Sequence, residues 1–155
     1  MRYPVIAFTG LALLFLSAGA ANPRCEQENV VAKACDAVFA AFTQVPGGKT
    51  TREAVPGHGC RLSIEGTFSG LGDSRPPDRL VQPALEPLGW SRDSTLDADG
   101  PDGTSFVLRN DKAECRVEGW WGDAVEARPA ARPGDSYVVT VDVRQGETAA
   151  RAQLQ

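Results

Sequence analysis

The chain has 155 residues, a formal net charge of −4 and 42% hydrophobic residues. This length is typical of a single domain that can bury a sizeable core. Its arginines are scattered and its balance is mildly acidic, so it lacks the basic footprint of proteins that bind nucleic acid or anionic membranes, and we predict neither partner.

The N-terminal segment has the three parts of a secretory signal peptide. Arg2 supplies a positive charge, an apolar stretch follows at 5–16, and the small residues SAGAA occupy 17–21. We predict cleavage after Ala20 or Ala21, and therefore a protein that is exported to a periplasm or secreted. The apolar stretch is shorter than the roughly 20 residues of a spanning helix, and no later stretch is apolar enough, so we predict no membrane span after signal removal.

The four cysteines all follow the predicted cleavage site, at Cys25, Cys35, Cys60 and Cys115. An even number of cysteines in an exported chain predicts two disulfides. No C-x-x-C spacing is present, so neither a redox motif nor a four-cysteine zinc site is favoured. Three pairings are possible. We favour Cys60–Cys115, joining two strands, together with Cys25–Cys35, tying the N-terminal lead to its helix.

Two helices are predicted from apolar periodicity. Residues 28–44 carry apolar side chains at i, i+3, i+4 and i+7, and the Pro46-Gly47-Gly48 segment ends this helix. The second helix begins at Pro76-Pro77 and ends before Gly89. Pro83 lies inside it, and the missing backbone N–H predicts a kink or a shorter helix.

Four strands are predicted from alternating apolar and polar residues, at 60–68, 104–110, 113–121 and 136–144. The polar segments at 49–59, 91–103 and 122–135 are predicted loops. The resulting order, α-β-α-β-β-β, is typical of an α+β domain with helices on one face of a mainly antiparallel sheet. We therefore predict a signal peptide at 1–20, one domain at 21–146 and a flexible C-terminal tail at 147–155.

An acidic segment, DADGPDG at 97–103, resembles a calcium-binding loop at first sight. A 12-residue calcium loop that starts at Asp97 would place Asp99 at position 3, but Pro101 falls at position 5 and Leu108 replaces the glutamate at position 12. We interpret the segment as a turn, in which Asp and Gly are favoured residues. A calcium site formed by Asp97, Asp99 and Asp102 in a cation-stabilised domain is the alternative.

Catalytic chemistry has little support in the sequence. His58 is the only histidine and lies in a predicted loop, and no G-x-S-x-G motif is present. A hydrolase with His58 as its general base is a further alternative. We predict no catalytic residue and no cofactor.

The adjacent tryptophans give the most specific signal. Side chains alternate along a strand, so Trp120 and Trp121 must point to opposite faces. Parity with the apolar positions sends Trp121 inward and Trp120 outward, beside Arg116 and Glu118. With Trp90, which ends the second helix, these residues are candidates for binding an unknown protein or small ligand of the cell envelope. Packing of Trp120 under the 122–135 loop is the structural alternative. We expect a non-enzymatic binding domain.

Overall fold

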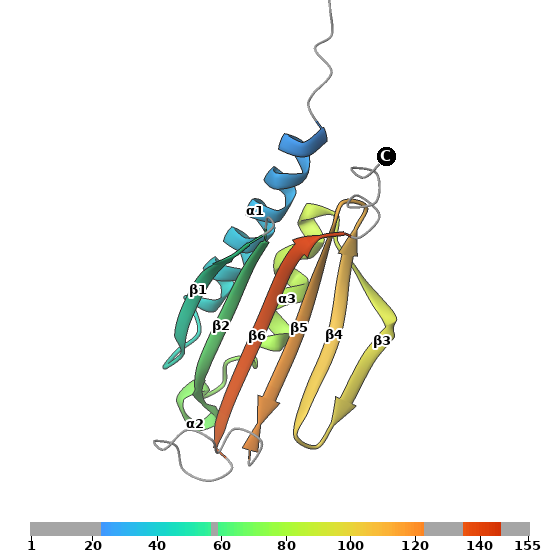
Figure 1. The fold of residues 1–155 in the computed structure, drawn as a ribbon. Helices are drawn as coiled ribbons and strands as arrows, with labels where there is room; N and C mark the ends of the chain where they lie inside the picture. Colours follow the sequence, from blue (N-terminus) through green and yellow to red (C-terminus); the bar gives the residue numbers. More distant parts are fainter. Residues whose placement is uncertain (1–22, 57–58, 123–134, 147–155) are drawn as a thin grey trace, which may run out of the picture.

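The computed structural model describes residues 23–56, 59–122 and 135–146. These residues form one six-stranded sheet in which every neighbouring pair of strands is antiparallel. The main helices lie against one face of the sheet, and no helix of the described residues covers the other, which we call the open face (Figure 1). The predicted α+β class, with helices on one face of an antiparallel sheet, is confirmed.

The elements follow the chain as α1 (Pro23–Phe42), β1 (Lys49–Val55), β2 (Gly59–Thr67), α2 (Phe68–Leu71), α3 (Asp78–Leu85), the short 3₁₀ helix η1 (Glu86–Leu88), β3 (Ser91–Gly100), β4 (Gly103–Asn110), β5 (Ala113–Trp121) and β6 (Ser136–Gln145). Across the sheet the order is β1-β2-β6-β5-β4-β3, so β6 lies in the middle although it is last in sequence. None of the described helices is both long and apolar enough to cross a membrane.

Both edges of the sheet are strands where the sequence predicted loops. β1 falls within 49–59 and β3 within 91–103. Six of the seven β1 residues are exposed, and β3 contains no buried residue. Alternation reveals a strand only when one of its faces is buried, so these edge strands carry no such signal. The loop predictions for these two segments are therefore wrong.

The two main helices behave as their sequences predict. Val31, Ala34, Val38 and Phe42 of α1 are all buried against the sheet, at the spacing of one helical face. α3 is short and contains Pro83. The α-helix ends at Leu85 and continues as the 3₁₀ helix η1 from Glu86. Gly89, with a φ of 81°, caps the end of η1. The predicted shortening follows from the backbone N–H that proline lacks.

The core lies between these helices and the inward side chains of the central strands. Leu62 and Ile64 of β2, Val139 and Val141 of β6 and Val117 of β5 are each at most 1% exposed. The register places Leu62 opposite Val141, and Val141 opposite Val117, so the alternating positions of three strands form one continuous apolar layer.

A disulfide joins Cys35 of α1 to Cys60 of β2 and ties the helix layer to the sheet. The pairing Cys60–Cys115 favoured from the sequence is wrong, because β6 lies between the two strands. Val143 of β6 is opposite both cysteines. Two strand spacings put the cysteines about 9–10 Å apart, and a disulfide requires Cα atoms closer than about 7 Å.

The pairing Cys25–Cys35 is also wrong, since Cys35 is bonded to Cys60. Ten residues of one helix separate Cys25 from Cys35, which is about 15 Å along the axis. The side chain of Cys25 lies outside what the structure describes. Cys115 is a free and buried thiol. Burial raises the pKa of this thiol, which keeps it protonated and chemically inert.

Gly66 leaves room for the side chain of Tyr137 at the end of the core where β2 ends and β6 begins. The two residues are opposite each other on β2 and β6. A β-carbon on Gly66 would lie 2.7 Å from Cζ of Tyr137, which is less than a van der Waals contact. Tyr137 is 1% exposed and contacts the ring of Phe68, with centroids 5.5 Å apart. The tyrosine therefore occupies space that any other residue at position 66 would take.

Replacing Cys35 and Cys60 together with alanine should lower the free energy of unfolding. The disulfide closes a 25-residue separation, for which restriction of the unfolded chain accounts for about 3.5 kcal/mol. Urea denaturation followed by circular dichroism measures the loss, and the wild-type protein titrated with urea in the presence of a reductant should show the same loss. Equal stability of the double variant and the wild type would contradict this role of the disulfide.

Gly66→Ala should destabilise the protein by about 1–3 kcal/mol, because the added methyl group overpacks a site that Tyr137 already fills. Gly72→Ala is not a suitable control, since its φ is 56°. Gly66→Ala combined with Tyr137→Phe removes the hydroxyl oxygen that the methyl group would meet at 2.5 Å. This double variant should recover part of the loss in the same urea titration. No recovery would assign the clash to the ring, whose Cζ the methyl group would still meet at 2.7 Å, and unchanged stability of Gly66→Ala itself would contradict the overpacking.

Candidate functional site: the open face of the sheet

The open face is formed by the outward side chains of the sheet, and β5 runs through it. Arg116, Glu118 and Trp120 alternate with the buried residues of β5 and point away from the helices. Trp120 is 49% exposed, the largest exposed fraction of any large hydrophobic residue in the described ranges. The structure thus brings three of the four predicted residues onto one strand and one face.

Trp90, the fourth predicted residue, does not belong to this surface. It precedes β3 and is 3% exposed within the core. Its indole N–H is buried without a hydrogen-bond partner among the described residues. Trp90 is therefore a core residue. Its burial could not be predicted, because it stands at a helix end rather than within an alternating strand. His58 lies outside the described residues.

Ion pairs connect the open face from strand to strand. The Nε of Arg61 on β2 donates to Oδ1 of Asp142 on β6 at 2.7 Å, and a second guanidinium nitrogen donates to Oδ2 at 3.2 Å. This hydrogen bond raises the pKa of Arg61. Nearer the other end of β5, Glu114 accepts from Arg144 at 2.7 Å and from Arg109 at 3.4 Å. The outward charges of these strands are mostly matched.

Arg116 and Glu118 are the exception to this pairing. Neither makes a hydrogen bond or ion pair with another residue within 23–56, 59–122 and 135–146. Arg116 is opposite Asp142 across the sheet, but that carboxylate already binds Arg61. Two opposite charges therefore stand side by side on β5 with their hydrogen-bonding capacity available to another molecule.

The ring of Trp120 is supported from one side by the β3–β4 hairpin. A β-carbon on Gly103 would lie 3.3 Å from Cε3 of Trp120 and would collide with the carbonyl oxygen of Gly119, so only glycine lets the ring and the strands come this close. The hairpin is itself held in place. Trp121 donates from its indole nitrogen to the carbonyl of Pro101 at 2.9 Å and from its backbone to Asp102 at 3.0 Å.

Two depressions flank the β5 row and share Glu118. One, of about 460 Å³, lies between Trp120 and the hairpin residues 98–105. The other, of about 430 Å³, is lined by Arg61, Arg116 and Arg144 together with Asp142. Together they form a surface with an aromatic end and an arginine-rich end. The four residue steps from Trp120 to Arg116 span about 13 Å of strand. We call this surface the Trp120 surface.

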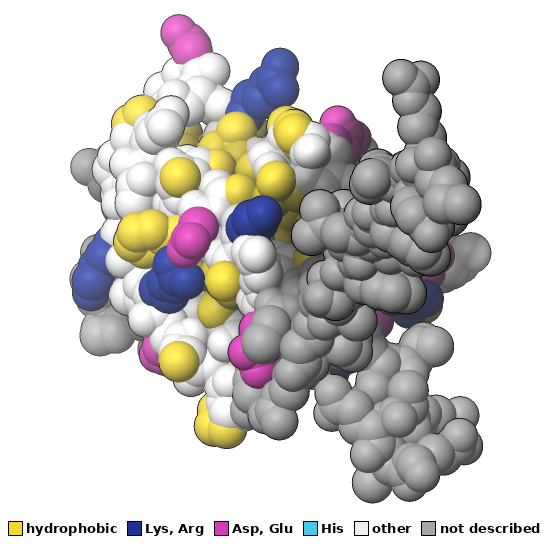
Figure 2. Space-filling view, turned by 90° about the horizontal axis from the view of Figure 1, so that it is seen from above, with side chains coloured by type: hydrophobic (Ala, Val, Ile, Leu, Met, Phe, Trp, Pro, Cys, Tyr) yellow, Lys and Arg dark blue, Asp and Glu magenta, His cyan; other side chains and the backbone are white. Residues whose placement is uncertain are grey.

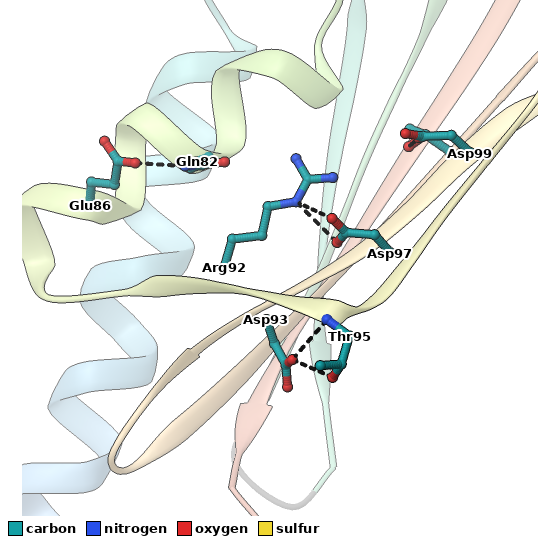
Figure 3. A network of polar contacts seen from close by, with 8 residues as sticks. Gln82, Glu86, Arg92, Asp93, Thr95, Asp97 and Asp99 are labelled. Atoms are coloured by element: carbon teal, nitrogen blue, oxygen red, sulfur yellow. Dashed lines mark hydrogen bonds and ion pairs between the residues drawn. The ribbon is translucent and has the colours of Figure 1, made fainter.

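The aspartates of the acidic segment do not converge. Asp97 accepts from Nε of Arg92 at 3.0 and 3.1 Å, and Asp99 accepts from the hydroxyl of Thr104. Figure 3 shows the two carboxylates directed to different places along β3. Arg92 in turn stacks on the ring of Phe106, 4.2 Å from its centroid. Within the described ranges no group of three His, Cys, Asp or Glu side chains is placed to hold a metal ion.

Asp93 has a structural role where β3 loses its register against β4. Its carboxylate accepts from the backbone and hydroxyl of Thr95, at 3.2 and 2.6 Å, and lies 3.2 Å from Arg109. The Thr95 hydrogen bond lowers the pKa of Asp93. The carboxylate therefore stabilises an irregular strand segment, as Asp does in turns.

Comparisons with known proteins give no assignment. No family model, no curated protein and no solved structure matches this chain.

Seen from above, the molecule has apolar side chains interspersed with basic and acidic ones (Figure 2). The candidate site therefore rests on the geometry of the Trp120 surface.

Calcium should leave the thermal midpoint of unfolding unchanged within about 1 °C, since an ion stabilises the folded form only when that form binds it better than the unfolded chain. Asp97 and Asp99 already bind Arg92 and Thr104. Scanning calorimetry with millimolar calcium, magnesium or chelator measures this. A rise of several degrees with calcium alone would support the cation-stabilised domain instead.

Proposed function

We propose that this chain is an exported, non-enzymatic binding domain that recognises a protein partner through the Trp120 surface. The signal-peptide pattern at 1–20 supports export, and the Cys35–Cys60 disulfide is compatible with an oxidising compartment. The observation that carries the proposal is the 49% exposure of Trp120 in line with Arg116 and Glu118.

The chemistry of these three residues is that of a recognition site. Tryptophan and arginine are enriched among the residues that dominate binding energy at protein interfaces. The indole offers a large apolar surface, and tryptophan has only two side-chain torsions to fix on binding, so binding loses little side-chain entropy. Arg116 can form a bidentate hydrogen bond with a carboxylate, and Glu118 can bind a basic group.

A protein partner fits this surface better than a small molecule. Both depressions are open to solvent on one side, whereas small-molecule sites bury most of their ligand. An extended segment that places an apolar side chain on Trp120 and an acidic side chain on Arg116 would span the distance between them. Trp120 would then supply affinity, and the charges would supply register and specificity.

Trp120→Ala should weaken binding of the captured partner by about 30-fold or more, as expected for a central tryptophan. Affinity capture with the purified chain identifies the partner, and titration calorimetry measures the affinities. Arg116→Glu should weaken binding comparably by reversing a charge, and Trp120→Phe should retain part of the affinity.

Leu96→Ala is the matched control, because Leu96 is 42% exposed but lies on the edge strand β3. Circular dichroism establishes that each variant is folded. Full affinity of both Trp120→Ala and Arg116→Glu would overturn the proposed surface, whatever partner is captured.

A further inference from the structure

The two edges of the sheet differ in how they are protected from further strand pairing. Every β-sheet edge exposes unpaired backbone N–H and C=O groups that can accept another strand. On β3 the register is broken between Asp93 and Ala98, and an irregularity of this kind blocks continuous pairing. The edge of β3 is also acidic, with Asp93, Asp97 and Asp99.

The β1 edge has no such break in register. β1 pairs with β2 in unbroken register from Lys49 to Val55, so its backbone is regular along its whole length. No proline stands within it, and six of its seven residues are exposed. The outer edge of β1 is therefore a regular strand of seven residues with which another strand can pair.

The charges on β1 favour a second copy of the same strand. Antiparallel pairing of two β1 strands around a two-fold axis opposes residues whose numbers are symmetric about the centre. A centre at Arg52 would oppose two guanidinium groups, and a centre at Glu53 would oppose two carboxylates, both of which are unfavourable. A centre at Thr51 instead places Lys49 of each copy opposite Glu53 of the other copy. The two Thr51 residues are then opposite each other.

The side chains of this pair are available for such contacts. Lys49 has 76% of its side chain exposed and lies 3.5 Å from Glu65, so its present ion pair is loose. Glu53 makes no hydrogen bond or ion pair with another described residue. Both side chains are on the open face of the sheet. Arg52, on the helix side, is held by Asp36 at 2.7 Å and stays clear of the contact.

We propose that two copies of this chain associate through their β1 edges, antiparallel and centred on Thr51, to form one sheet that continues across both molecules. A two-fold axis perpendicular to the sheet keeps the two open faces on the same side. The β1 edge lies three strand positions from β5, so the Trp120 surface of each copy remains uncovered.

Charge reversal tests the register. Lys49→Glu and Glu53→Lys should each weaken the dimer about tenfold or more, because both symmetric pairs then oppose like charges. The double variant restores opposite charges and should recover the affinity of the wild type. Sedimentation equilibrium of the full purified chain at low salt measures each dissociation constant. Trp120→Ala should leave it unchanged, which separates this interface from the Trp120 surface.

A cross-link tests the centre of symmetry. Thr51→Cys places two thiols opposite each other, with Cα atoms about 4.5–5.5 Å apart, which suits a disulfide. It should give a covalent dimer on a non-reducing gel, whereas Glu53→Cys, about 13 Å from its symmetry mate, should not. A wild-type chain that stays monomeric up to millimolar concentration would overturn the proposal. So would a dimer that is insensitive to both charge reversals, or a β1 edge that instead pairs with a strand of another protein.

Discussion

The helices cover the face of the sheet on which Cys60 lies, and the Cys35–Cys60 bond holds α1 to that face. Cys35 lies on the buried side of α1 and Cys60 on the inward side of β2, so the bond joins the two layers within the core. Because side chains alternate along each strand, the covered face also determines which residues of every other strand face outward. The exposure of Trp120 on β5 follows from the burial of Cys60 two strands away.

The open face then has to be compatible with water. Matched ion pairs such as Arg61–Asp142 and Arg144–Glu114 cover it, and each contributes little to stability when exposed. Their main effect is to remove unmatched charge from most of the face. Arg116 and Glu118 are distinctive against this background because their neighbours are already paired.

Much of the fold was predictable from the sequence, and the reasons are local. Periodicity identified α1 and the four strands with a buried face, and parity sent Trp120 outward and Trp121 inward. The edge strands were missed because neither has a buried face.

The order of the strands in the sheet could not be predicted either, since alternation shows which face a residue points to but not which strand lies beside it. The disulfide prediction failed for that reason, with Val143 of β6 standing between Cys60 and Cys115. Because the strand order could not be predicted, Arg61 and Asp142 were also not recognised as neighbours of Arg116.

The central position of β6 has a consequence for how the molecule is assembled. Before β6 is in place, β1 and β2 form one hairpin and β3, β4 and β5 form a separate meander, with no hydrogen bonds between the two sheets. Residues more than 80 positions apart, such as Cys60 and Val143, must meet before the halves join. Pairing over such separations carries a large loop-closure entropy and slows folding. The cooperative native state therefore forms only once residues 136–145 are available to pair, and until then the half-sheets expose edges that β6 will later cover.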